Sequence, residues 1–206
     1  MVEEAGSAAE RWRRDTDALG MYLFLASELM LFGALAAAAL FLRMAHPDEI
    51  VAASTKLHLW IGAANTLILL TSSMAVALAV ELARRERAKQ VATCVAAAVL
   101  LGGLFLVLKG FEYHAEYTEG LLPGFGANRF AGPAEHLFMN LYLIATALHA
   151  LHLAVGMLLL GTIAWRLRGR GMKLPGSLSF VENSGLYWHL VDVIWVFLYP
   201  LLYLVR

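Results

Sequence analysis

Hydrophobic residues form five long runs that are separated by short polar stretches. The runs cover about residues 18–42, 58–82, 91–111, 137–165 and 185–205. A helix needs roughly 20 apolar residues to cross a hydrocarbon core of about 30 Å, and each run reaches that length. The strands of a membrane barrel are shorter and alternate in polarity, so continuous runs favour helices. The pattern predicts an all-α membrane protein, a bundle of five transmembrane helices.

The distribution of lysine and arginine predicts how this bundle is oriented. Most basic residues lie in residues 11–14, 84–89 and 166–173, which the five runs place on one side of the membrane. The other side carries only Arg43, Lys56, Lys109, Arg129 and Arg206. Because basic loops stay in the cytoplasm, the N-terminus is predicted to be cytoplasmic and the C-terminus outside. The longest loop, about residues 112–136, is acidic and is predicted to lie on the outer face.

Composition supports a single membrane domain. Of the 206 residues, 60% are hydrophobic and 16% are charged, and the formal net charge is zero. Soluble domains are nearer to half apolar. Residues 1–17 are expected to form a polar cytoplasmic segment without a cleavable signal peptide, and residues 18–206 the transmembrane domain. The chain has no basic surface of the kind that nucleic-acid binding needs, so no nucleic-acid partner is expected.

One carboxylate interrupts the first apolar run. Glu28 lies in MYLFLASELMLFG, residues 21–33, near the predicted bilayer midplane. A charged carboxylate there costs several kcal/mol, so the side chain is expected to be protonated or paired. We predict no basic residue deep in the runs, which leaves His149, His152 or His189 as partner. We interpret Glu28 as a buried protonatable group, largely neutral at pH 7; the alternative is a hydrogen-bonded packing residue.

Other polar residues recur at helical spacing and predict a polar seam between packed helices, because such residues bond across helix contacts in membranes. The seam residues are Asn65, Thr66, His149, His152, His189 and Asp192. His189 and Asp192 are three residues apart on one helix face, so a local hydrogen bond between them is feasible. These residues either anchor neighbouring helices or form part of a proton or ligand path.

The histidines lack the pattern of a metal or haem site. His149 and His152 lie one turn apart on one helix and cannot clamp a haem between them, so a second ligand would have to be His189 or His58. Zinc needs three or four converging ligands. The sequence also has no CxxCH, P-loop or GxGxxG motif. We therefore expect no catalytic residue, no cofactor site and no metal site in this chain.

Five segments, in the same order, resemble subunit III of the haem–copper oxidases, and the resemblance covers about residues 18–205. The segments are LFLASELMLFG (23–33), NTLILLTSS (65–73), KGFEYHAEY (109–117), HALHLAVG (149–156) and VENSGLYWHLVDVIWVFLYPLLYL (181–204). Ala150 stands where the family usually has glycine. Mitochondrial-type members have seven helices, and this chain lacks the first two. A partner would have to replace those helices, or lipids would have to bind differently.

The resemblance implies a non-catalytic subunit of an aerobic respiratory complex in the bacterial cytoplasmic membrane. Haem and copper would belong to partner subunits, and this chain would pack against the catalytic subunit I, with subunit II nearby. It would bind phospholipid and support proton uptake and proton translocation over many turnovers. Glu28 matches the family's carbodiimide-reactive carboxyl. The other matching motif positions are Glu112, Tyr113, His149, His152, Glu182, Tyr187, Trp188, His189 and Asp192.

Several functions stay open on the sequence. Cytochrome c is slightly favoured over quinol as electron donor, since five-helix members also occur in quinol oxidases, and related accessory chains go with nitric oxide reductases. A stand-alone membrane cytochrome b and a proton-coupled transporter using Glu28 are further alternatives. The lack of internal repeats and of broken helices counts against a transporter. Membership of a larger respiratory supercomplex is also undecided.

Overall fold

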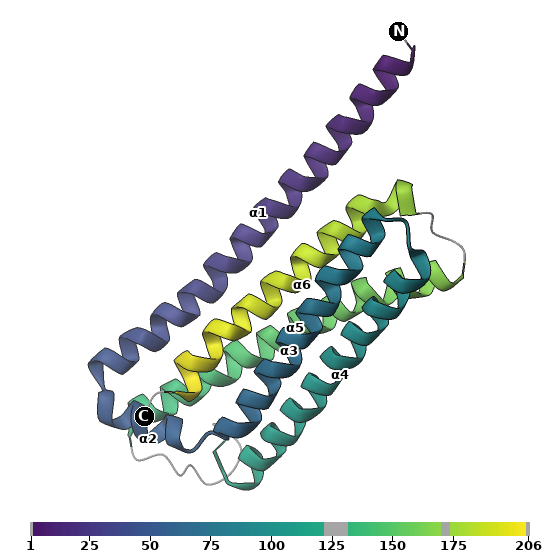
Figure 1. Ribbon diagram of the computed structural model, residues 1–206. Coiled ribbons are helices and arrows are strands. Elements are labelled where there is room, and N and C mark those ends of the chain that lie inside the picture. The colour runs from purple at the N-terminus through teal and green to yellow at the C-terminus, as the bar shows by residue number, and fades with distance from the viewer. Residues whose placement is uncertain (1, 122–131, 170–173, 205–206) are drawn as a thin grey trace.

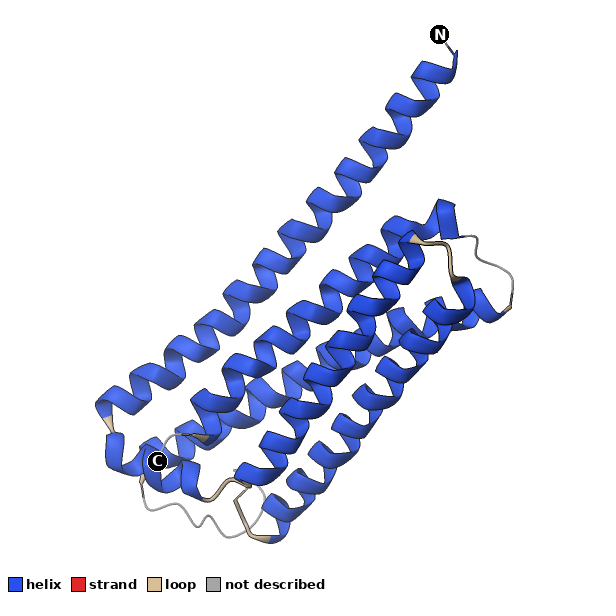
Figure 2. Cartoon of the chain, in the orientation of Figure 1, coloured by secondary structure: helices blue, strands red, loops and turns tan. Residues whose placement is uncertain are grey.

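The computed structural model describes residues 2–121, 132–169 and 174–204, and these form six helices (Figures 1 and 2). The helices are α1 (Val2–Ala45), α2 (Pro47–Thr55), α3 (Leu59–Arg84), α4 (Ala88–Thr118), α5 (Pro133–Arg168) and α6 (Leu174–Tyr203). Five of them are long and apolar enough to cross a membrane, and α2 is not among these. The prediction of an all-α protein with five transmembrane helices is confirmed.

Helices α3 to α6 pack side by side as an antiparallel bundle, and α1 lies along its flank (Figure 1). Helix α1 contacts α5, α6 and α2, while its N-terminal turns extend past the bundle. Short α2 lies at the end of the bundle where α6 also ends. The first helix thus joins the bundle along one side only, and its contacts with α5 and α6 position the site described below.

The observed helices are longer than the predicted ones. Helix α1 already begins at Val2, so the polar residues 1–17 continue the helix of the first span. Helix α2 was not predicted, because nine residues are too few to form an apolar run. Pro47 at its first turn and the acidic Asp48 and Glu49 beside it are typical of a helix N-terminus.

The loop predicted over residues 112–136 is too long at both ends. Helix α4 continues to Thr118 and α5 begins at Pro133, so only part of that range lies between helices. Glu112, Glu116 and Glu135 are buried within these helices. Their charges lowered the hydropathy of the sequence, but the residues are paired with other groups and therefore do not end the helices.

Helix α2 is tied to the start of α5 by two carboxylates. The Oε2 atom of Glu49 accepts hydrogen bonds from the backbone N–H groups of Ala134 (3.1 Å) and Glu135 (3.4 Å). The N-cap residue of α5 is Gly132, which has no side chain to satisfy these donors. Lys56, after the end of α2, also pairs with the Glu135 carboxylate. These bonds explain why the short helix is held against the bundle.

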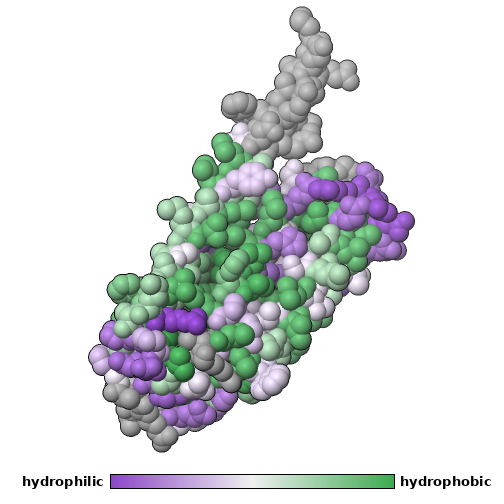
Figure 3. All heavy atoms as spheres, turned by 60° about the vertical axis from the view of Figure 1, so that its left-hand side comes forward, coloured by the Kyte–Doolittle hydropathy of each residue, from purple (hydrophilic) through white to green (hydrophobic). Residues whose placement is uncertain are grey.

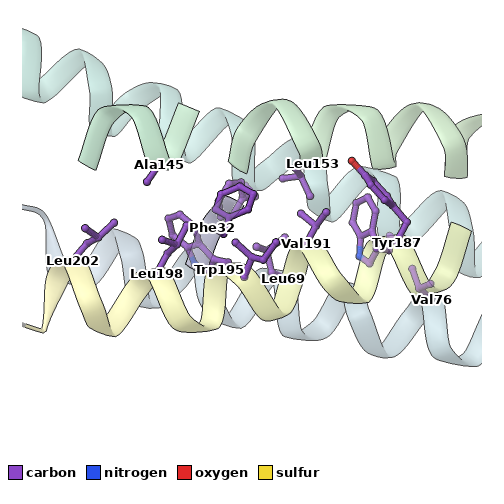
Figure 4. Packing of buried hydrophobic residues seen from close by; sticks show 14 of the residues in the cluster. Phe32, Leu69, Val76, Ala145, Leu153, Tyr187, Val191, Trp195, Leu198 and Leu202 are labelled. Atoms are coloured by element: carbon purple, nitrogen blue, oxygen red, sulfur yellow. The ribbon is translucent and has the colours of Figure 1, made fainter. Parts of the chain in front are cut away.

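The apolar side chains face both the interior and the outside. Phe32 of α1, Leu153 of α5 and Val191 of α6 meet in one packed core (Figure 4). Met30 and Phe41, in contrast, are 77% and 69% exposed. Apolar residues cover the middle of the face in Figure 3, and hydrophilic residues lie toward its two ends. This distribution suits a multi-pass membrane protein, because lipid tails cover apolar residues as well as a core does.

Two adjacent glycines on α4 offer a direct test of this packing. A Cβ atom on Gly102 would lie 2.9 Å from Trp188, whereas one on Gly103 would meet only Met157, at 3.7 Å. We expect Gly102→Ala to lower the free energy of unfolding by about 1–3 kcal/mol, because the indole must move within a full core. Gly103→Ala is the control and should leave the thermal unfolding midpoint in detergent nearly unchanged. Equal midpoints for the two variants would contradict this packing.

Candidate functional site

Glu28 forms a polar contact between α1 and α5. Its Oε2 atom lies 2.8 Å from Nε2 of His152, and the two side chains are only 15% and 14% exposed. The other ring nitrogen of His152, Nδ1, lies 2.7 Å from the backbone carbonyl oxygen of Leu148. A carbonyl only accepts hydrogen bonds, so Nδ1 carries a proton and Nε2 is the ring nitrogen that faces Glu28, at ion-pair distance but without the geometry of a hydrogen bond. Of the three histidines that the sequence offered, the structure selects His152.

Aromatic residues surround the Glu28–His152 pair. Phe24 and Phe32 lie four residues before and after Glu28 and therefore share its face of α1. Phe24 stacks on Tyr187 of α6 with ring centroids 5.9 Å apart, and Phe32 packs edge-on against His152 at 5.4 Å. The hydroxyl of Tyr187 donates to the backbone oxygen of His152 at 3.0 Å. The Glu28–His152 contact thus lies in a largely apolar setting, where an uncompensated charge is costly.

The remaining seam residues lie within the bundle of α3 to α6. Asn65 and His149 are fully buried, and the ring of His149 lies between Phe105 and Trp195 at 5.5 and 5.0 Å. Thr66 accepts a hydrogen bond from Nε1 of Trp195 at 3.1 Å. These contacts connect α3, α4, α5 and α6. The two histidines of α5 therefore face different surroundings, His149 the bundle interior and His152 helix α1.

The feasible bond between His189 and Asp192 is replaced by contacts to α3. Ser73 Oγ lies 2.6 Å from Nδ1 of His189. Asp192 is buried at 3% exposure, and neither oxygen of its carboxyl has a hydrogen-bond partner among the residues that the structure describes. Ser73 thus links α3 to His189 of α6.

The family-motif residues also lie on helix contacts. The phenol of Tyr113 is 2.5 Å from Thr146 Oγ1, which joins α4 to α5. Trp188 is fully buried against Gly102 and Gly156. Glu182, near the start of α6, accepts a hydrogen bond of 3.0 Å from Nε of Arg84, which is the last residue of α3. Each of them joins two helices, as expected of structural positions.

One basic residue is buried inside the bundle, which was not predicted from the sequence. Lys109 of α4 is only 2% exposed and belongs to a buried polar group that we call the Lys109 cluster. The cluster consists of Lys109, Glu112, Glu116, Tyr142 and Tyr203. Sequence analysis missed Lys109, Glu116 and both tyrosines as site residues. A signal was present, since Lys109, Glu112 and Glu116 fall at steps of three and four and so share one helix face.

Two of the hollows that border α1 differ in the polarity of their linings. One, of about 480 Å³, lies between α1, α3 and α6 and is lined by polar residues such as Tyr22, Arg84 and His189 together with apolar ones. The other, of about 270 Å³, lies between α1 and α6 and is lined only by apolar residues and one glycine, including Leu29 and Phe197. Within residues 2–121, 132–169 and 174–204 we find no group of three His, Cys, Asp or Glu residues able to hold a metal ion.

Comparison with known proteins identifies the family. The model of the cytochrome c oxidase subunit III family matches residues 9–205. Cytochrome c oxidase subunit 3 of Thermostichus vulcanus is 32% identical over 193 residues, which are 92% of this chain and 88% of the relative. A probable quinol oxidase subunit 3 of Staphylococcus epidermidis is 26% identical, over 91% of this chain and 88% of the relative.

A third relative has a different chain organisation. The haem–copper oxidase subunit I+III of Aeropyrum pernix is 29% identical over 99% of this chain, which corresponds to 25% of that longer protein. The family match over residues 9–205 covers all five spans. The chain belongs to the cytochrome c oxidase subunit III family and is a non-catalytic subunit III of a haem–copper oxidase.

Proposed function

We propose that this subunit III packs against a catalytic subunit I, together with subunit II, in the bacterial cytoplasmic membrane, with its N-terminus in the cytoplasm. The observation that carries the proposal is the Aeropyrum pernix relative, whose name joins subunits I and III in one chain. Fusion of two chains requires that they lie close together in the assembled complex. The haem and copper of the reaction would then be held by the partner subunits.

Purification through a tag on the N-terminus, in mild detergent, tests this assembly. A large haem-bearing subunit should copurify, and the optical spectrum should show its haem. A colourless chain purified alone would contradict the proposal and favour a transporter. Haem retained by this chain alone would instead indicate a membrane cytochrome b and overturn the interpretation of its histidines.

Cytochrome c is the donor that we propose, and quinol is the second candidate. Several similar chains are named cytochrome c oxidase subunit 3, whereas the Staphylococcus epidermidis relative is named for a quinol oxidase. Oxygen consumption by the purified complex, measured with reduced cytochrome c and then with a quinol, distinguishes the donors. Reduction of nitric oxide without reduction of oxygen would assign the complex to the nitric oxide reductases.

Phospholipid is proposed to bind along α1. The hollow beside Arg84 is also lined by the carboxylates of Glu81 and Glu182, and Glu182 accepts a hydrogen bond from Arg84. It therefore suits a zwitterionic headgroup, whose phosphate the remaining guanidinium donors match and whose cation the carboxylates match. The apolar groove beside Leu29 and Phe197 could hold an acyl chain. Mass spectrometry of the purified complex should detect retained phospholipid. An Arg84→Gln variant should retain less of it; equal retention would contradict a headgroup site there.

The Glu28–His152 pair is proposed to hold a proton in support of proton uptake by the complex. Glu28→Gln should leave assembly and the thermal midpoint of the complex nearly unchanged. The glutamine amide can donate to Nε2 of His152, as a protonated carboxyl would, while Nδ1 keeps its bond to Leu148.

Glu28→Leu is the matched control for this prediction. Leucine fills the same space but leaves the ring nitrogen of His152 without a partner, at a cost of about 1–3 kcal/mol. Loss of stability is therefore expected for leucine and not for glutamine. If Glu28→Gln lowered the thermal midpoint as much as Glu28→Leu, the pair would need a negative charge on Glu28. That result would refute the neutral form of Glu28.

A further inference from the structure

The Lys109 cluster contains more acidic groups than basic ones. Glu112 and Glu116 are fully buried, and Lys109 is 2% exposed. If all three were ionised, the cluster would carry a net negative charge at a depth where water does not compensate it. An uncompensated buried charge is far more costly than a buried neutral acid. The cluster should therefore hold one additional proton, and its hydrogen bonds indicate where.

The ammonium of Lys109 uses all three of its protons. Nζ donates to Oε2 of Glu112 at 2.9 Å, to the phenol of Tyr142 at 2.9 Å and to the phenol of Tyr203 at 2.5 Å. Tyr203 in turn donates to Oε1 of Glu112 at 2.7 Å. Both oxygens of Glu112 thus accept a hydrogen bond, as suits an ionised carboxylate. Lys109 and Glu112 form a satisfied and electrically neutral pair.

Glu116 has a different set of contacts. The hydroxyl of Tyr142 accepts a hydrogen bond from Lys109 and donates one to Oε1 of Glu116 at 2.6 Å. The Oε2 atom of Glu116 is buried and has no hydrogen-bond partner among the residues that the structure describes. An ionised carboxylate would leave a charged oxygen without a donor, whereas a protonated one leaves only a neutral hydroxyl. The additional proton is therefore assigned to Oε2 of Glu116.

Charged groups on the neighbouring elements do not alter this assignment. Glu119, one turn further along α4, lies 3.9 Å from His58 before α3. Glu135 of α5 is paired with Lys56. Among residues 2–121, 132–169 and 174–204, Lys109 is the cation that faces both carboxyls of the cluster, and it is already bound to Glu112.

We propose that Glu116 is a buried proton-binding site of this subunit, separate from the Glu28–His152 pair. The proton resides on Oε2, and Tyr142 connects the carboxyl to the Lys109–Glu112 ion pair. The site lies near the end of α4, where α6 also ends with Tyr203. The two proposed proton sites, Glu28 and Glu116, thus lie on different helices, α1 and α4.

Two matched variants in the complete oxidase complex test the proposal. Glu116→Gln and Glu112→Gln make the same chemical change one turn apart, at positions equally buried. Glu116→Gln should assemble at the wild-type level, because an amide resembles a neutral acid. Glu112→Gln should reduce the recovered complex roughly tenfold or more, since it leaves Lys109 as an unpaired buried cation. Equal losses, or failure of Glu116→Gln to assemble, would overturn the proposal.

Infrared spectroscopy of the assembled Glu116→Gln complex identifies the proton directly. The spectrum of wild type minus Glu116→Gln, at neutral pH, should contain the C=O stretch of one protonated carboxyl, and this band should shift in D₂O. Glu119→Gln is the control, because Glu119 is exposed, and it should show no such band. Loss of a carboxylate band instead would show that Glu116 is ionised and that the assignment of the proton is wrong.

Discussion

Replacing Lys109 with methionine should lower the free energy of unfolding by about 3–5 kcal/mol, which is the usual cost of breaking a buried ion pair. Methionine approximates the length and volume of the lysine stem, so packing changes little. What is lost is the ammonium that bonds Glu112, Tyr142 and Tyr203. Glu112 is then left as a buried carboxylate without its cation. Thermal unfolding of the purified complex, followed in detergent, measures the effect.

A second substitution separates the loss of charge pairing from simple loss of contact. In Lys109→Met with Glu112→Gln, both members of the ion pair become neutral, and most of the stability should return. The amide that Glu112→Gln introduces can still accept a hydrogen bond from Tyr203. In Lys109→Met with Glu116→Gln, the unpaired Glu112 remains, so stability should not return. Equal recovery in the two double variants would contradict the pairing assigned to Glu112.

The five spans could be predicted from hydropathy because lipid-facing and core-facing positions are both apolar. Hydropathy failed over residues 112–136, since it treats a charged residue as polar whether or not the residue is paired. The spacing of Lys109, Glu112 and Glu116 on one helix face was the available signal. It could have placed the three charges together, but the tyrosines that complete their hydrogen bonds come from α5 and α6. Whether these tyrosines lie next to the three charges depends on tertiary packing.

The sequence reduced the candidate partners of Glu28 to three histidines but could not identify which of them is the partner. Charge and depth reduced the candidates to His149, His152 and His189. Selecting His152 required the register of α1 against α5, which is fixed by contacts such as Phe24 with Tyr187 and Phe32 with His152. Residue spacing within one helix carries no information about the register between two helices. The same limit explains why Ser73 was not identified as the partner of His189.

Trp188→Ala is the second substitution expected to have a large effect, again about 3–5 kcal/mol of unfolding free energy. The indole is fully buried between α4 and α5. A Cβ atom on Gly102 or Gly156 would come within 2.9 and 3.0 Å of it. Both helices thus use glycine to make room for this side chain. Alanine would leave a cavity that the surrounding helices, already closely packed, cannot close.

The expected loss can be assigned to the cavity by comparison with two other variants. Trp188→Phe keeps most of the ring volume and should cost less than alanine. Trp60→Ala removes the same atoms at a position that is 84% exposed, and it should change the free energy by no more than about 0.5 kcal/mol. Thermal midpoints of the three complexes in one detergent give the comparison. A midpoint for Trp188→Ala equal to that for Trp60→Ala would mean that the junction of α4, α5 and α6 does not depend on this indole.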